Sequence, residues 1–323
     1  MIHGSTEPVP TDRESLLSPE LAGRLDRLDI KSHKMFPGAL PGERRSKRRG
    51  TSVEFDDYRT YVPGDDLRHI DWNVYARMDR LFLKLFREEE DLAVTIVVDA
   101  SPSMHAGMPS KLIYAHRLAM ALAHVGLVGN NRVGMASFGT GLGYASLAPG
   151  RGRRRLQAAS AFLLESLERA VSLDAKAPSG SVLTAALRRA ARERTGKGVF
   201  VLISDCLARE GYQEGIGLLA NTAHGGFDTT VLQLLSPGEI DPAAEGDRFV
   251  GDLRLSDAES GPDAEITVTA ELLERYRRRV QGYIDGLRDF CRSRRITHTL
   301  VSTDTPLEEL LLGTLRRQGM LGT

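Results

Sequence analysis

Oxygen-bearing side chains gather in the short segment Asp99-Ala100-Ser101-Pro102-Ser103. The carboxylate of Asp99 and the hydroxyls of Ser101 and Ser103 alternate along it, directly after the apolar run 92–98. Hard divalent cations such as Mg²⁺ bind oxygen ligands and usually keep waters or a partner's oxygen in some coordination positions. The spacing therefore predicts part of a Mg²⁺ or Mn²⁺ site. The alternative is a capped turn, in which the serines accept hydrogen bonds from helix N–H groups.

Two further residues extend the candidate site. Asp205 follows a second apolar run, 198–204, and Ser181 begins a helix that precedes this run. Runs that are apolar on both faces are typical of parallel strands covered by helices. In an open α/β sheet, ligands bind outside the carboxyl ends of the strands. If the two strands are neighbours, Asp99 and Asp205 share that edge, which favours the metal site over the capped turn.

The elements that must position these residues alternate between strand-like and helix-like patterns from residue 81 onward. Residues 81–87 predict a strand of an antiparallel ribbon, and residues 110–128 predict a helix that is apolar on nearly all sides. A long amphipathic helix near 270–293 and a last strand at 296–302 follow. The alternation predicts a doubly wound, mostly parallel α/β sheet over residues 81–323, with a small β appendage inserted near 236–269.

The first 80 residues predict two other parts. Residues 1–43 predict a loose leader over 1–17 and then a helix that starts at Ser18-Pro19. Residues 44–80 begin with a dense basic run at 44–49 and continue with charged and aromatic residues that show little helix or strand periodicity. For this segment we favour an ordered collar held by ion pairs over a catalytic cluster of carboxylates. For the basic run we favour a solvated loop over a contact with a polyanion.

Composition limits the classes of function. Lys+Arg and Asp+Glu both number 43, which gives a formal net charge of +0. Without a global positive field, the chain is not expected to bind nucleic acid or anionic membranes in general. No apolar run approaches the roughly 18 residues of a membrane span, and the N-terminus lacks a signal-peptide pattern, so we expect a cytoplasmic protein. Cys206 and Cys291 show no metal-binding or disulfide spacing.

The arrangement of the site residues resembles the metal-ion-dependent adhesion site of von Willebrand factor A domains. The matching residues are Asp99, Ser101, Ser103, Ser181 and Asp205. The third-loop residue of that family is usually threonine, and Thr184 lies nearby, so Ser181 and Thr184 are alternatives for this position. Cys206 stands where the family usually has glycine. The resemblance covers about residues 92–235 and implies a Rossmann-like domain whose bound ion accepts a carboxylate from a partner.

A longer pattern precedes the first strand of the predicted sheet. It runs from Arg49-Gly50 through Tyr58-Arg59 and Gly64-Asp65-Asp66 to Asp71-Trp72. This pattern resembles the signature of the bacterial domain of unknown function 58 family. Members of that family resemble one another over the part that corresponds to about residues 40–320 here. The resemblance implies an A-type domain and, commonly, a neighbouring gene for a MoxR-type AAA+ ATPase.

These observations lead to two hypotheses of function. We favour a protein-interaction module that docks a partner's carboxylate through Mg²⁺ or Mn²⁺ and acts with a MoxR-type AAA+ ATPase in the assembly or maturation of protein complexes. The alternative is a metal-dependent hydrolase or phosphotransferase that uses Asp99 or Asp205. No motif places a histidine base near either acid and no GxxxxGK[ST] loop occurs, so we assign no catalytic residue.

Overall fold

The structure is a computed structural model of the chain, in which two compact units are distinguished. It describes residues 7–32, 54–63, 67, 70–87, 92–172, 182–194, 198–208, 210–220, 227–242, 251–255 and 264–322. The larger unit comprises Met1–Pro37 and Leu92–Thr323, and the smaller one comprises Gly38–Asp91. This division differs from the predicted boundaries, because the N-terminal residues belong to the sheet unit and the strand at 82–87 belongs to the smaller unit.

A six-stranded sheet forms the centre of the larger unit, with the strand order β11-β8-β7-β4-β5-β6. The strands are β4 (Ala93–Asp99), β5 (Arg132–Gly139), β6 (Gly143–Gly150), β7 (Gly198–Ser204), β8 (Phe227–Leu235) and β11 (Thr297–Ser302). All neighbours are parallel except β5 and β6, which are antiparallel. The mixed α/β class with a mostly parallel sheet is therefore confirmed.

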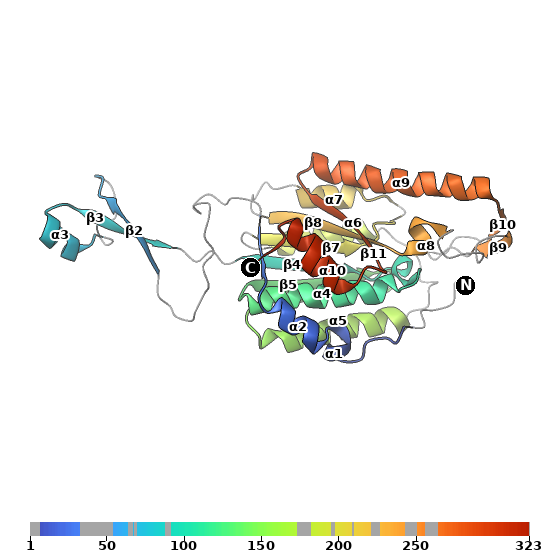
Figure 1. Ribbon diagram of the computed structural model, residues 1–323, viewed down its shortest axis with the longest axis horizontal. Coiled ribbons are helices and arrows are strands. Elements are labelled where there is room, and N and C mark those ends of the chain that lie inside the picture. Colours follow the sequence, from blue (N-terminus) through green and yellow to red (C-terminus); the bar gives the residue numbers. More distant parts are fainter. Residues whose placement is uncertain are drawn as a thin grey trace. The chain divides into compact units, whose positions relative to one another are not determined.

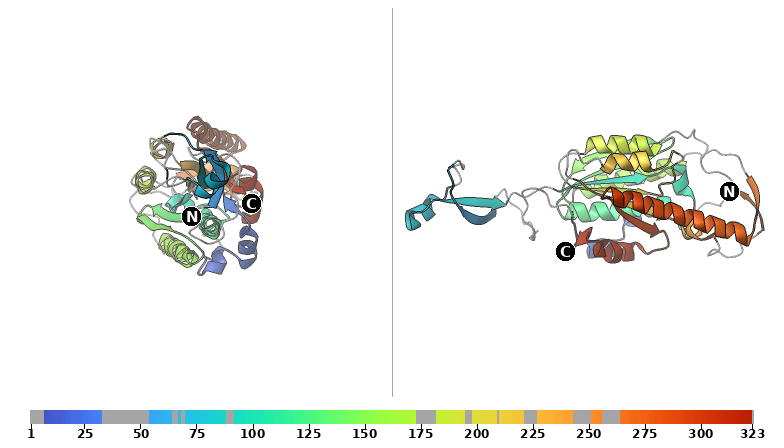
Figure 2. Two further views of the ribbon diagram at one scale, coloured as in Figure 1. Left: turned by 90° about the vertical axis from the view of Figure 1, so that its left-hand side faces the viewer. Right: turned by 90° about the horizontal axis from the view of Figure 1, so that it is seen from above.

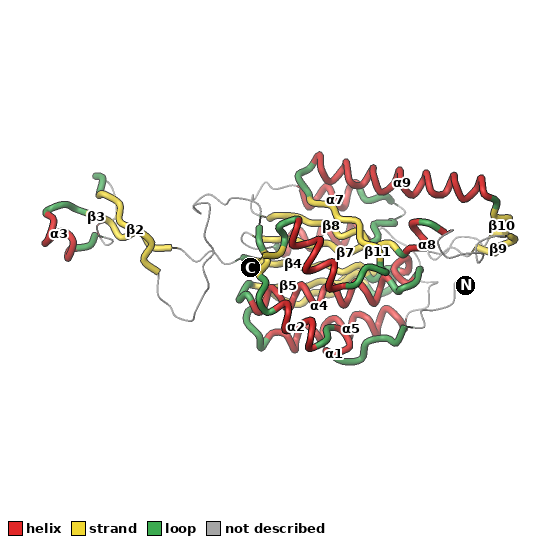
Figure 3. The backbone as a smooth tube through the Cα atoms, viewed as in Figure 1, coloured by secondary structure: helices red, strands yellow, loops and turns green. Residues whose placement is uncertain are grey.

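Helices cover both faces of this sheet (Figure 1 and Figure 3). One layer contains α4 (Lys111–Val128) and α5 (Arg155–Ser172), and the other contains α6 (Val182–Glu193), α7 (Gln213–Ala220) and α9 (Ala270–Ser293). Two apolar clusters, one on each side, hold the layers together. Covered strands bury both faces, which explains why the runs before Asp99 and Asp205 are apolar throughout.

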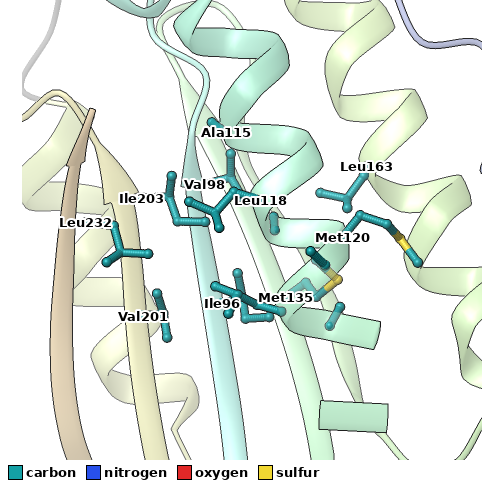
Figure 4. Packing of buried hydrophobic residues seen from close by; sticks show 14 of the residues in the cluster. Ile96, Val98, Ala115, Leu118, Met120, Met135, Leu163, Val201, Ile203 and Leu232 are labelled. Carbon is teal, nitrogen blue, oxygen red and sulfur yellow. The ribbon is translucent and has the colours of Figure 1, made fainter. Parts of the chain in front are cut away.

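The helix α4 packs into the larger of the two clusters. Sixteen of its residues are buried, as its apolar sequence predicts. In Figure 4, Leu118 of this helix lies among Ile96 and Val98 of β4 and Ile203 of β7. The element that follows the serine loop is thus fixed by close packing, and the loop itself lies between two rigid elements.

The remaining elements of the larger unit are short. They include η2 (Pro102–His105), α8 (Pro237–Ile240), β9 (Gly251–Leu255), β10 (Ala264–Val268), α10 (Leu307–Glu309) and the π-helical turn η4 (Leu310–Leu315). The strands β9 and β10 pair antiparallel, which confirms the predicted β appendage. Figure 2 shows α9 along the outside of the unit, where it begins next to β10. None of the described helices combines the length and apolar character needed to cross a bilayer.

Residues 1–6 of the predicted loose leader lie outside the described residues. Residues 7–32 are part of the domain, so the described part of that leader is not loose. They form α1 (Arg13–Leu16), α2 (Pro19–Leu25) and β1 (Asp29–Ile30), which pairs with β12 (Leu321–Gly322). The helix predicted from Ser18-Pro19 is confirmed as α2, with Ser18 as its N-cap. Leu16 and Leu17 are buried in the cluster around α4, so apolar burial outweighs the local signal for disorder.

The smaller unit contains an antiparallel ribbon of β2 (Glu54–Thr60) and β3 (Phe82–Arg87) and the helix α3 (Trp72–Met78). The strand predicted at 81–87 is confirmed, but β2 falls where no strand periodicity was found. Residues 58–60 are exposed, so this part of the strand has no buried face to produce alternation. Asp71 caps α3 and accepts a hydrogen bond from the Tyr58 hydroxyl at 2.9 Å, which is a structural role. The basic run 44–49 lies outside the described residues.

A buried polar network links α4, α5 and β5. His116 Nδ1 lies 2.7 Å from the Leu112 carbonyl oxygen, and its Nε2 lies 3.1 Å from Ser166 Oγ. Because a carbonyl only accepts, Nδ1 carries the proton and Nε2 accepts from the Ser166 hydroxyl, which in turn accepts from Ser137. The imidazole is fully buried and neutral, and burial lowers the pKa of His116 to about 4.

This depressed pKa predicts a loss of stability in mild acid. The unfolded His116 takes up a proton below about pH 6.5, whereas the folded one stays neutral until about pH 4. We expect His116 alone to lower the free energy of unfolding by about 2 kcal/mol between pH 7 and pH 5. Urea unfolding of His116→Asn, which retains a donor but does not titrate, should show a correspondingly smaller dependence on pH. An unchanged difference between the variant and the wild type at the two pH values would contradict this.

Candidate metal-binding site

The carboxyl ends of β4 and β7 bring the two predicted aspartates to one edge of the sheet. The strands are direct parallel neighbours, with Val98 opposite Ile203. Asp99 is the last residue of β4 and Asp205 follows the last residue of β7. Their exposed fractions are 4% and 1%, so both carboxyl groups are removed from bulk water. The predicted juxtaposition of Asp99 and Asp205 is therefore present.

The serine loop does not form the capped turn that was the alternative interpretation. Ser101 begins the single turn η2 in an extended conformation, but its side chain makes no capping hydrogen bond. The cap of the next helix is Ser110, whose hydroxyl accepts from the Ile113 N–H at 3.3 Å. Ser101 Oγ instead lies 3.1 Å from Ser103 Oγ. Neighbouring oxygens on an octahedral Mg²⁺ lie about 3.0 Å apart, as follows from Mg–O distances of about 2.0–2.1 Å. The two hydroxyls thus have the spacing of adjacent ligands.

Asp99 is held by donors from both strands. One carboxylate oxygen accepts from the Ser101 N–H at 2.8 Å, and the other accepts from the Ser204 hydroxyl at 2.6 Å. Ser204 Oγ also accepts from the N–H of Cys206 at 2.9 Å. Cys206 has φ +60, in the left-handed region that favours glycine, so the cysteine adopts a turn for which the resemblance led us to expect glycine. Ser204 was not among the predicted residues, although it adjoins Asp205 in the sequence.

A buried lysine contacts the second aspartate. Lys111 Nζ donates to Asp205 Oδ2 at 2.9 Å and to Glu239 Oε1 at 2.5 Å, and the lysine side chain is completely buried. Neither Lys111 nor Glu239 was predicted. A lysine at the first position of a helix faces the positive end of the helix dipole, which signals a carboxylate partner. The spacing Ser236-x-x-Glu239 signals a capping box, but it does not reveal the contact with the lysine.

The buried charges shift the pKa values of the site. Burial and, after it, the nearby charge of Asp205 raise the pKa of Asp99 to about 7, although hydrogen bonds from Ser101 and Ser204 act in the opposite direction. For Lys111, burial by itself lowers the pKa, but the charges of Asp205 and Glu239 outweigh it and raise the pKa above its usual value. Strongly shifted pKa values of this kind occur at many functional sites, where burial and paired charges are held in place by the fold.

Ser181 and Thr184 are the two candidates for the third-loop ligand. Ser181 lies outside the described residues. Thr184 is described, and its hydroxyl is buried without a hydrogen-bond partner. A Cβ atom added at Gly215 of α7 would lie 3.4 Å from Thr184 Oγ1, so the threonine packs towards α7. This packing favours Ser181 as the third-loop ligand.

The donor set fits a hard cation and not a soft one. Within the described part of the chain, no three histidine, cysteine or acidic side chains form a group that could hold a metal by themselves. A site here depends on the hydroxyls of Ser101 and Ser103 together with Asp99 and Asp205. Hydroxyl and carboxylate oxygens with room for water are the coordination that Mg²⁺ and Mn²⁺ accept.

Comparison with known proteins identifies the family. The profile of the family described as "Protein of unknown function DUF58" matches residues 57–282, which is more than half of the chain. The chain therefore belongs to the DUF58 family. Uncharacterized proteins of Mycobacterium bovis and Mycobacterium tuberculosis are 27% identical over 273 residues, which cover 82% of this chain and 80% of theirs.

Two solved structures show a similarity to this DUF58 protein at low sequence identity. An aerotolerance-related membrane protein from Bacteroides fragilis has 20% identity and a TM-score of 0.40, with 70% of this chain and 99% of that chain covered. The pilus adhesin SpaC from Lactobacillus rhamnosus GG has 13% identity and a TM-score of 0.39, with 73% of this chain and 31% of that chain covered. At these scores the similarities support no argument about site or function.

The paired carboxylates predict an unusual effect of Asp99→Asn on stability. Because the pKa of Asp99 is raised from its usual 3.8 to about 7 in the fold, its ionisation destabilises the cation-free fold increasingly as pH rises between these two values. In the presence of a chelator at pH 8, we expect Asp99→Asn to raise the free energy of unfolding by about 2 kcal/mol. At pH 5, where the folded carboxyl is protonated but the unfolded one is ionised, this gain should be smaller than at pH 8, and below about pH 4 it should be lost. Chemical unfolding at both pH values measures it, and a variant less stable than wild type at pH 8 would contradict it.

The unpartnered hydroxyl predicts the outcome of Thr184→Val. Removing a buried hydroxyl without a partner should stabilise the fold by about 1 kcal/mol. The variant should bind Mn²⁺ as the wild type does, whereas Ser181→Ala should bind it more weakly. Thermal unfolding and Mn²⁺ titration of the two variants test this. A loss of Mn²⁺ affinity in Thr184→Val alone would assign the threonine as the ligand.

Proposed function

We propose that this DUF58 protein is a metal-dependent interaction module, built on a von Willebrand factor A-like domain with a metal-ion-dependent adhesion site. In this proposal Ser101 and Ser103 bind Mg²⁺ or Mn²⁺ directly, and Ser181 supplies a third hydroxyl. Asp99 and Asp205 contribute negative charge and orient bound water. The bound ion accepts a carboxylate of a partner protein in an open coordination position.

The observation that supports this proposal most strongly is the state of the two serine hydroxyls. They lie 3.1 Å apart, and the capping role that would otherwise explain Ser101 is absent. They also adjoin two buried carboxylates at the edge where α/β sheets bind ligands. In this proposal the groups that contact the ion directly are neutral hydroxyls, so the ion keeps its affinity for a partner's carboxylate.

The partner in this proposal is a MoxR-type AAA+ ATPase, and the process is the assembly or maturation of protein complexes. Support for this partner comes from the sequence resemblance alone, which commonly implies a neighbouring gene for such an ATPase. A carboxylate on the ATPase would complete the coordination of the ion. The proposed ion would accept this carboxylate, because its direct ligands are hydroxyls and because Asp99 and Asp205 already accept hydrogen bonds from the protein.

A second candidate function is a metal-dependent hydrolase or phosphotransferase that uses Asp99 or Asp205. The pKa of Asp99 near 7 favours it, since a carboxyl group of this kind can act as a general acid or base. The carboxylate oxygens of both aspartates are, however, engaged by donors of the protein. This arrangement orients a cation better than it positions a base against a substrate.

Titration of the protein with Mn²⁺ tests the proposed site. Binding is measured as a decrease of the electron paramagnetic resonance signal of free Mn²⁺. We expect one bound ion per chain, and a loss of affinity of about tenfold or more in Ser101→Ala because a direct ligand is removed. The control is Ser160→Ala, since Ser160 is a more buried serine whose hydroxyl donates within α5, to the carbonyl of Gln157. Equal affinity in wild type and Ser101→Ala, or no binding by the wild type, would refute the site.

Capture of the purified MoxR-type ATPase, with and without a chelator, separates the two functions. The interaction module predicts capture that needs the divalent ion and is abolished in Ser101→Ala. If capture ignored the ion while phosphatase or esterase activity required it, the enzyme hypothesis would replace the module.

A further inference from the structure

The ammonium group of Lys111 is a fixed part of the site. Its Nζ atom lies 2.9 Å from Asp205 Oδ2 and 2.5 Å from Glu239 Oε1, and the side chain has no exposed surface. Lys111 is also the first residue of α4, whose position is set by packing on the sheet. The lysine therefore cannot withdraw into solvent, unlike a surface lysine with its mobile chain.

Glu239 is fixed just as firmly on the other side of the ammonium group. Its Oε2 atom accepts from the Ser236 N–H at 2.8 Å and from the Ser236 hydroxyl at 3.0 Å, which leaves Oε1 for Lys111. The carbonyl of Glu239 accepts from the Tyr276 hydroxyl of α9 at 2.9 Å. The positive charge is thus held between two carboxylates whose positions depend on other contacts.

The charge of the site decides whether a bound ion can attract another anion. When all groups are ionised, the carboxylates of Asp99, Asp205 and Glu239 together with the ammonium of Lys111 carry a net charge of −2. One divalent cation then makes the site neutral. Without the lysine the loaded site would keep a negative charge, and in a buried site a single charge strongly repels an approaching carboxylate.

We propose that Lys111 is a specificity-determining residue that makes the cation-loaded site neutral and thereby permits capture of a carboxylate. The inference rests on the proposed function. It assigns a role to a residue that is not proposed to contact the partner, and whose described hydrogen bonds go to Asp205 and Glu239 and not to the serine hydroxyls. It predicts that removal of the lysine charge separates two properties. Binding of the cation is kept or strengthened, and binding of the carboxylate is lost.

The experiment uses the full chain, Mn²⁺ as the ion and acetate as the carboxylate probe. Displacement of ion-bound water by acetate is followed through the water-proton relaxation rate. For Lys111→Met we expect Mn²⁺ affinity at least equal to the wild type and acetate binding weakened about tenfold or more, by loss of one nearby charge. Lys111→Arg retains the charge and should restore acetate binding. Arg117→Met removes a charge further along α4, where Arg117 pairs with Glu7, and should change neither property.

Glu239→Gln provides the opposite change and serves if Lys111→Met does not fold. It removes a negative charge while the lysine stays, so Mn²⁺ should bind more weakly and acetate at least as well as in the wild type. Unchanged acetate binding in a folded Lys111→Met, or weaker acetate binding in Glu239→Gln, would overturn the role of Lys111 alone. If the wild type bound no Mn²⁺, or bound Mn²⁺ but no acetate, the proposed function itself would fall and this inference with it.

Discussion

Two carboxyl groups that repel each other, those of Asp99 and Asp205, lie at the ends of adjacent parallel strands inside the sheet. Both are nearly inaccessible to water, so the cost of their charges is met by neighbouring groups of the protein. Ser204 and the backbone of the serine loop donate to the first, and Lys111 donates to the second. The pKa of Asp99 near 7 shows that this compensation is incomplete. The divalent cation of the proposed function would complete it.

The same constraint explains why the four serines around the loop make different hydrogen bonds. Ser110 caps α4, and Ser204 binds the carboxylate of Asp99. Ser101 and Ser103 contact each other through their hydroxyls. Had Ser101 capped η2, its hydroxyl would be occupied by a backbone N–H, and the loop would be an ordinary turn. Capping by a separate residue leaves the hydroxyls for a ligand.

The family match extends over both units of the chain. It begins within β2 of the smaller unit and ends within α9, so the family is defined by more than the sheet domain. The described residues of the smaller unit include exposed aromatic side chains such as Trp72 and Tyr75, whose rings contact each other edge to face. In the larger unit, α9 reaches the site through α8, since Tyr276 and Arg277 bind the residues around Glu239. Elements remote from the strand ends therefore help to fix the groups that surround the two aspartates.

The sequence by itself determined the local features of this protein. Apolar runs ending in Asp99 and Asp205 predicted the covered strands, and the uniform apolar character of 110–128 predicted a buried helix, because burial on all sides leaves a direct trace in composition. Only the tertiary structure decided that Leu16 is in the core, that β2 is a strand, and that Lys111 lies between Asp205 and Glu239. Asp205 and Glu239 lie 94 and 128 positions from the lysine along the chain, and no periodicity in the sequence indicates contacts over such separations. A charge is buried only where the fold supplies its counter-charge, and that depends on which distant segments pack together.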